Sequence, residues 1–128
     1  MVPKSLRVWF IIHFAVDMLF GIPLLIAPGR ILHIFGWFIV DAFATRLVGA
    51  ALMGIGIESL LGRSAGLETF KHMLNLKIIW SGVAVLGMVA TILTQYVSPV
   101  GWLFVAVFAG FYVIWVYYRF RLDRVNTV

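Results

Sequence analysis

The chain has 128 residues, of which 63% are hydrophobic and 12% are charged, and its mean hydropathy is +1.07. Soluble domains contain about 45–50% apolar and about 25% charged residues, so a water-soluble fold of this length would leave too much apolar surface exposed. Cysteine is absent, which excludes disulfides, thiolate metal ligands and cysteine nucleophiles.

The net charge of +5 does not indicate a nucleic-acid-binding protein. The basic residues flank long apolar runs and do not alternate with aromatic residues across one surface. Positive charges at the ends of apolar runs are typical of the cytoplasmic loops of membrane proteins. We therefore expect membrane lipid, and no nucleic acid, to be the partner of this surface.

Four apolar runs are long enough to cross a bilayer. A hydrocarbon core about 30 Å thick needs about 20 residues of α-helix, and backbone in lipid must satisfy its own hydrogen bonds. The first run carries Asp17 at its centre and is longer than the apolar part of a signal peptide, so we expect a retained span. The sequence predicts an all-α membrane bundle, one domain over residues 1–128, with spans at about 6–28, 42–61, 74–94 and 99–118.

The connections between these runs are short. Residues 30–40 (RILHIFGWFIV) are too few to span but are rich in apolar and aromatic side chains. We expect them to lie along the outer interface, after a break at Pro28. Asp41 is predicted to cap the second helix. Residues 62–70 are predicted to be a polar loop, and the Ser-Pro pair at 98–99 predicts a tight turn.

The distribution of Lys and Arg predicts the orientation. Seven of the ten basic residues lie in the amino-terminal segment, the second loop and the tail, whereas the first and third connections contain only Arg30. The other two, Arg46 and Lys77, lie within runs. Because cytoplasmic loops carry the excess of Lys and Arg, we expect a multi-pass protein of the cell membrane with both termini in the cytoplasm.

Ionisable side chains inside the apolar runs are the candidate functional residues. Such groups are costly in lipid, so they are expected to face the interior of the bundle and to pair with one another. Comparing depths at a rise of about 1.5 Å per residue predicts two pairs, Asp17 with Arg46 and Glu58 with Lys77. The complete set is His13, Asp17, Arg46, Glu58 and Lys77.

Small residues accompany these charges at helical spacing. Ala50 and Gly54 lie at four-residue steps between Arg46 and Glu58. Small residues at this interval let helices approach closely, so three helices are expected to share a polar interior. The predicted helix-packing residues are Gly21, Ala50, Gly54 and Ser81.

The three histidines do not indicate a metal or haem site. His13, His33 and His72 fall at different depths, so they cannot surround one ion. No phosphate loop, dinucleotide fingerprint or nucleophile–base–acid set is present. We therefore expect no metal, no cofactor and no catalytic residue, and an enzymatic role is not favoured.

The region from residue 23 to residue 61 runs PLLIAPGRILHIFGW and later RLVGAALMGIGI. It resembles the DoxX-like and related families of small four-helix prokaryotic membrane proteins of unknown function. Those families often show Arg-x-x-Gly with a further glycine at the start of helix two, here Arg46, Gly49 and Gly54. The resemblance implies the four-helix plan and carries no catalytic residue across. Because DoxX is associated with a terminal quinol oxidase, it also implies an accessory role beside a respiratory complex.

Three functions remain open from the sequence. The first is a structural or accessory membrane protein acting alone, as a homo-oligomer or as a subunit of a larger membrane complex. The second is a transporter or channel for protons, ions or a small solute, suggested by the charges within the spans. The third is a membrane enzyme or a quinone- or lipid-binding protein, suggested by aromatic residues of the fourth run, namely Phe104, Phe108, Phe111, Tyr112 and Trp115.

Overall fold

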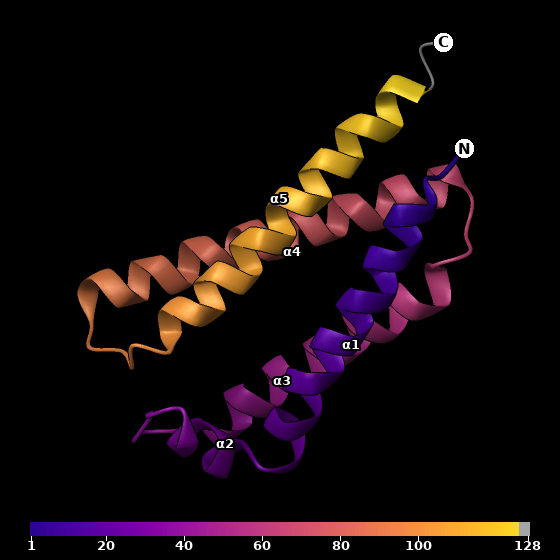
Figure 1. Cartoon of the computed structure of the whole chain (residues 1–128). Helices are drawn as coiled ribbons and strands as arrows, with labels where there is room; N and C mark the ends of the chain where they lie inside the picture. The colour runs from indigo at the N-terminus through magenta and orange to yellow at the C-terminus, as the bar shows by residue number, and fades with distance from the viewer. Residues whose placement is uncertain (126–128) are drawn as a thin grey trace. The chain divides into compact units, whose positions relative to one another are not determined.

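The computed structural model describes residues 1–125, which form five helices (Figure 1). Four of them are long and apolar enough to cross a membrane, which confirms the prediction of an all-α protein with four candidate spans. The chain divides into two compact units, Pro3–Ser64 and Ala65 onwards with Met1–Val2, and the single domain stays a prediction. The helices are α1 (Lys4–Ile26), α2 (Pro28–Ile34), α3 (Ala42–Gly62), α4 (Leu67–Thr94) and α5 (Gly101–Val125).

The predicted loop over residues 62–70 is wrong at its carboxyl end. α4 begins at Leu67, so the connection is only residues 63–66. The first turns of α4 are polar and helical, and Lys71 pairs with Glu68 one turn earlier at 3.2 Å. An apolar run marks only the part of a helix that suits lipid. For this reason α4 and α5 both extend beyond the predicted spans.

In the Pro3–Ser64 unit, the connection between α1 and α3 contains the short helix α2. α1 ends at Ile26 and Pro28 opens α2 at a first-turn position, where its missing N–H costs nothing. Gly36 closes the segment with φ of 92°, a conformation that side chains with a Cβ rarely adopt. Asp41 then caps α3, and its Oδ1 accepts a hydrogen bond from the Ala44 backbone N–H at 3.0 Å, which confirms the predicted cap.

α1 and α3 pack in an antiparallel arrangement through glycines. A Cβ built on Gly49 would lie 2.9 Å from the Gly21 carbonyl oxygen and 2.9 Å from the Leu25 backbone nitrogen. A Cβ on Gly56 would lie 2.7 Å from the Cβ of Asp17. Backbones at this separation leave no room for side chains between them, which is the typical use of small residues between membrane helices.

The second unit is an antiparallel hairpin of α4 and α5. The Gly101 N–H donates to the Ser98 carbonyl at 2.8 Å and the Trp102 N–H donates to the Pro99 carbonyl at 3.2 Å, which confirms the predicted tight turn. Along the hairpin, the rings of Trp80 and Phe108 lie 6.3 Å apart between centroids. Side-chain packing therefore joins α4 and α5 at this point between the turn and the helix ends.

Ion pairs connect the open end of this hairpin. The Lys71 Nζ lies 3.8 Å from the Asp123 Oδ1, and the Arg119 Nη1 lies 2.5 Å from the same oxygen. The Arg119 Nε also donates to the Asn75 Oδ1 at 2.8 Å. The amino end of α4 and the carboxyl end of α5 thus share one group of charges.

We expect Arg119→Gln to lower the melting temperature in detergent by no more than a few degrees, because exposed ion pairs contribute little. The Asp123 side chain is 52% exposed, so salt should screen its interaction with Arg119. Thermal unfolding at low salt and at about 1 M salt checks this. A loss that does not diminish with salt would show that the contact acts through packing.

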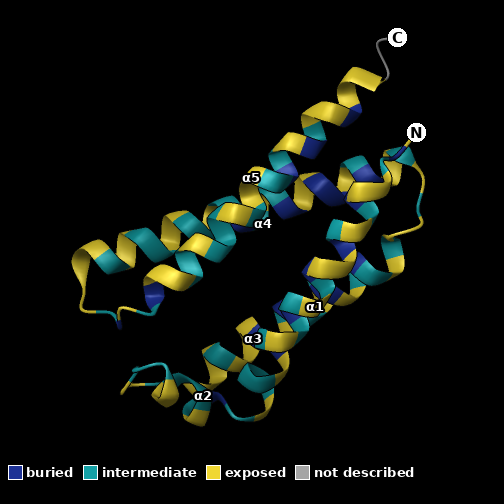
Figure 2. Cartoon of the chain, in the orientation of Figure 1, coloured by how far each residue is buried: buried dark blue, intermediate teal, exposed yellow. Residues whose placement is uncertain are grey.

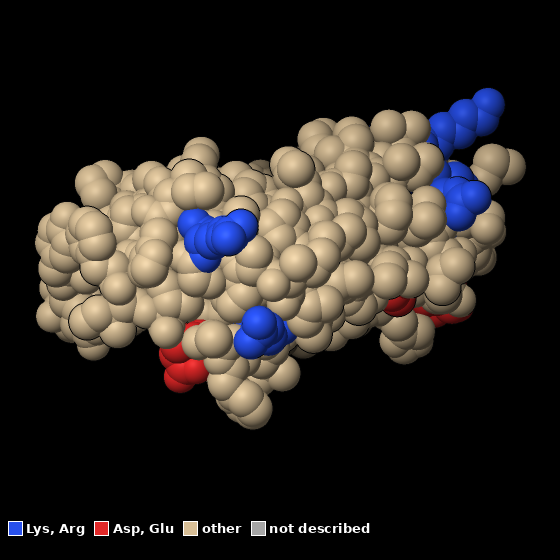
Figure 3. Space-filling model, turned by 90° about the horizontal axis from the view of Figure 1, so that it is seen from below, with Lys and Arg blue, Asp and Glu red and all other residues tan. Residues whose placement is uncertain are grey.

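Large apolar side chains cover the outer faces of the helices. Figure 2 shows exposed residues along the whole length of each long helix, and they include Leu19 at 67% and Leu86 at 72% exposure. On the face drawn in Figure 3, charged atoms form a few isolated groups within an uncharged surface. A surface of this kind suits lipid and not water.

Candidate functional site

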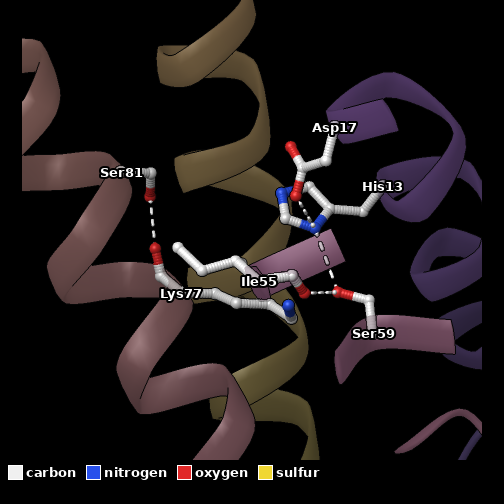
Figure 4. Close-up of polar contacts among 6 residues, drawn as sticks. All are labelled: His13, Asp17, Ile55, Ser59, Lys77 and Ser81. Atoms are coloured by element: carbon white, nitrogen blue, oxygen red, sulfur yellow. Dashed lines mark hydrogen bonds and ion pairs between the residues drawn. The ribbon is translucent and has the colours of Figure 1, made fainter. Parts of the chain in front are cut away.

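Polar side chains meet where α1 packs on α3. His13 and Asp17 lie one turn apart on the same face of α1, and Ser59 approaches them from α3 (Figure 4). The His13 Nδ1 is 3.3 Å from the Asp17 Oδ2 and 3.2 Å from the Ser59 Oγ. All three residues are buried, His13 and Asp17 at 5% exposure and Ser59 at 0%. We call these three residues the polar junction.

The Ser59 hydroxyl donates within its own helix. Its Oγ lies 2.9 Å from the Ile55 carbonyl oxygen, four residues earlier, which is a common arrangement for serine in membrane helices. The oxygen lone pairs of Ser59 therefore face the imidazole of His13. Ser59 thus joins the two helices as an acceptor while its own proton stays on α3.

Gly56 makes room for the carboxylate of the polar junction. A Cβ at this position would lie 3.3 Å from the Asp17 Oδ2 and 3.0 Å from the Met18 Cε, besides its collision with the Asp17 Cβ. The sequence analysis did not single out Gly56 and Ser59, and it named Gly49 as a motif residue but not as a contact with α1. The signal that could have found these three residues is their spacing of seven and then three residues along α3, with Leu52 also on this buried face.

The predicted packing residues are only partly in this contact. Gly21 is buried against α3, with a built Cβ lying 3.1 Å from the Gly49 carbonyl oxygen. Ala50 and Gly54 are exposed, and nothing lies within 4 Å of a Cβ built on Gly54. The α1–α3 contact therefore uses a different face of α3 from the one that the four-residue spacing predicted.

The predicted pair of Asp17 with Arg46 is wrong. Arg46 is exposed, and its Nε donates to the Leu25 carbonyl near the end of α1 at 3.1 Å. Asp17 lies against Gly56, ten residues further along α3 than Arg46. Ten helical residues span about 15 Å, which is too far for the arginine side chain to bridge. The depth comparison failed because it placed the centres of the two runs at the same level.

Glu58 and Lys77 lie on helices of different units. Glu58 is half-buried on α3, whereas Lys77 on α4 is 1% exposed. The Lys77 Nζ lies 5.8 Å from the ring centroid of Trp115, and the Lys77 carbonyl accepts a hydrogen bond from the Ser81 Oγ at 2.6 Å. The pairing of Glu58 with Lys77, and an interior shared by three helices, stay predictions.

Several aromatic residues of α5 contact α4. Besides Phe108 on Trp80, a Cβ built on Gly82 would lie 3.1 Å from the Tyr112 Cε2, and Phe111 stacks on the buried Trp115 at 5.6 Å. These rings pack within the hairpin. A quinone or lipid bound by them stays a prediction.

No family model, curated protein or solved structure matches this chain. The resemblance to the DoxX-like families therefore stays a prediction that depends on Arg46, Gly49 and Gly54. The function has to be argued from the helices and from the polar junction.

The polar junction is not arranged for nucleophilic catalysis. In a Ser–His–Asp triad the carboxylate and the hydroxyl contact opposite nitrogens of the imidazole, so that the ring can take the serine proton. Here Asp17 and Ser59 both contact the Nδ1 of His13. The Ser59 proton is also directed to the Ile55 carbonyl. The geometry supports helix association, but not activation of Ser59.

Proposed function

We propose that this protein is a structural or accessory component of the cell membrane, acting as a homo-oligomer or as a subunit of a larger membrane complex. The observation that carries the proposal is the polar junction, in which the imidazole of His13 contacts the Asp17 carboxylate on its own span and the Ser59 hydroxyl on a second candidate span. Interhelical hydrogen bonds of this kind hold membrane helices in register. The exposed apolar faces of the helices leave surface for lipid and for neighbouring membrane proteins.

Native extraction into polymer-bounded lipid discs tests this role. We expect the tagged protein to leave the membrane as a homo-oligomer or with a stoichiometric membrane partner. A monodisperse single chain under the same mild conditions would contradict the assembly. An accessory role beside a respiratory complex predicts that the partner is an oxidase subunit, whereas a homo-oligomer would contradict that narrower version.

The proposed topology places both termini in the cytoplasm. The Arg7 Nη1 donates to the Arg63 carbonyl at 2.6 Å, so three of the five basic residues of the Pro3–Ser64 unit, Lys4, Arg7 and Arg63, lie where α1 begins and α3 ends, and Arg30 and Arg46 lie toward the other end. In the other unit, Lys71 and Arg119 meet at Asp123, where α4 begins and α5 ends. Each hairpin therefore has one end that is richer in Lys and Arg, and the positive-inside rule assigns that end to the cytoplasm.

Single cysteines test this topology, because the natural chain contains none. Ser64→Cys lies in the basic connection and Gln95→Cys follows α4 at the opposite end of its hairpin, and both positions are exposed. In intact cells a membrane-impermeant maleimide should label Gln95→Cys and spare Ser64→Cys until the cells are opened. The reverse pattern would overturn the orientation.

A second candidate function is conduction of protons, ions or a small solute. It is favoured by the buried carboxylate and imidazole of Asp17 and His13, since such groups within spans commonly mark ion or proton paths. Liposomes containing wild type, Asp17→Asn or the exposed control Glu68→Gln distinguish it. Flux in wild type and control that is lost in Asp17→Asn supports conduction. Background flux in all three contradicts it.

A further inference from the structure

Arg46 lies within a candidate span, but on its outer surface. α3 has 21 residues and is therefore about 30 Å long, which matches the hydrocarbon core of a bilayer. Arg46 is four residues from the start of α3, so its Cα lies about 6 Å below that end of the helix. The residue is exposed. An exposed arginine at this depth extends its guanidinium to the level of the lipid headgroups.

The guanidinium of Arg46 is only partly engaged within the protein. Its Nε donates to the Leu25 carbonyl at 3.1 Å. Leu25 lies in the last turn of α1, where carbonyls have no partner within the helix, so this bond holds the guanidinium beside that helix end. Among residues 1–125, Arg46 forms no ion pair with an acidic side chain. The Nη1 and Nη2 groups thus remain as a fork of hydrogen-bond donors.

An open groove adjoins this fork on the surface of α3. It has a volume of about 440 Å³ and is lined by Phe43, Arg46 and Leu47. Phe43 and Leu47 are 84% and 64% exposed, and they lie four residues apart in the first turns of the helix. The groove therefore combines one cation with two apolar side chains. A phosphate headgroup with an acyl chain attached has the complementary parts.

We propose that Phe43, Arg46 and Leu47 form a binding site for a membrane phospholipid, with the lipid phosphate on the Arg46 guanidinium and an acyl chain along the two apolar side chains. The parallel N–H donors of arginine match two oxygens of a phosphate. Phosphates are also the anions that the bilayer itself supplies at this depth. The site depends on α3 being a span, and it is independent of whether the protein is an accessory subunit.

Native mass spectrometry of the delipidated protein in detergent tests the site, with phosphatidylglycerol as the probe. Phe43→Glu leaves Arg46 intact and places a carboxylate three residues before it, where the two side chains can pair. An acidic residue in the first turn of a helix is stabilising, so the variant should fold. We expect Phe43→Glu to weaken phosphatidylglycerol binding at least about tenfold, because hydrogen bonds to charged groups have this strength.

Phe43→Gln is the matched control, since it has the length of the glutamate variant without its charge. It should bind phosphatidylglycerol clearly more tightly than Phe43→Glu. Arg46→Gln should lose the same lipid, whereas Arg30→Gln, at an exposed position of α2, should keep it. Diacylglycerol, which lacks the phosphate, and inorganic phosphate, which lacks the chains, should each bind more weakly than phosphatidylglycerol. Thermal unfolding confirms that each variant is folded.

Equal affinity of Phe43→Glu and Phe43→Gln for phosphatidylglycerol would overturn the proposal. Undiminished binding by Arg46→Gln, or equal binding of diacylglycerol or of inorganic phosphate, would also overturn it. A delipidated dimer that Arg46→Gln dissociates would show that a second copy of the chain, and not lipid, engages Arg46. None of these measurements requires a partner protein, so the accessory role is tested separately.

Discussion

Gly49→Ala is expected to destabilise the α1–α3 contact by about 1–3 kcal/mol, the usual cost of forcing an extra carbon into a packed interface. The new Cβ would lie 2.9 Å from the Gly21 carbonyl oxygen and from the Leu25 nitrogen. Both are backbone atoms, so no side-chain rotation can relieve the collision and the two helices must separate. Reversible unfolding in mixed detergent measures the loss.

Gly54→Ala is the matched control on the same helix. Nothing lies within 4 Å of a Cβ at this position, so the substitution adds helix propensity without a collision. It should therefore be neutral or stabilising by up to about 1 kcal/mol. Equal destabilisation by Gly49→Ala and Gly54→Ala would contradict the observed face of α3.

Asp17→Ala is expected to cost about 1–3 kcal/mol, the usual cost of removing one partner from a buried polar group. The change removes the carboxylate whose Oδ2 lies 3.3 Å from the His13 Nδ1 on the same helix, and it leaves the space beside Gly56 unfilled. Asp17→Asn keeps the size of the side chain and one carbonyl acceptor, so its loss should be clearly smaller. The same unfolding assay compares the two variants.

The comparison of these two variants separates hydrogen bonding from charge. Equal losses for Asp17→Asn and Asp17→Ala would show that the negative charge, and not the acceptor, stabilises the polar junction. Two variants as stable as wild type would show that His13 gains nothing from Asp17. Either result would require a different account of why both side chains are buried.

The helices were predictable from the sequence because length and hydropathy alone decide whether a segment suits lipid. The cap at Asp41 and the turn at Ser98 were predictable as well, because each depends on side chains within a few residues. The start of α4 at Leu67 was not, because its first turns are polar and an apolar run does not mark them.

The packing face of α3 is a second feature that could not be predicted from the sequence. A four-residue step advances about 400° around a helix, so a stripe from Arg46 to Glu58 drifts by about 120° and leaves its starting face. A seven-residue step drifts by only about 20°. Gly49 and Gly56 are seven residues apart and both contact α1, whereas Ala50 and Gly54 are exposed.

The relative height of α1 and α3 is a third feature that could not be predicted from the sequence. The sequence defines the two apolar runs but not their relative height, which packing against the neighbour sets. In the structure Asp17 is level with Gly56, and Arg46 is level with the end of α1. The partners of Asp17 on its own helix, and of His13 on α3, therefore emerged only from the structure.

A double-mutant cycle with His13→Leu and Ser59→Ala tests most directly whether a buried hydrogen bond joins α1 to α3. The two side chains touch across the helices at 3.2 Å, so their effects on the free energy of unfolding should not add. We expect a coupling of about 0.5–1.5 kcal/mol, the range found between membrane helices. Strict additivity of the two single losses would contradict the polar junction.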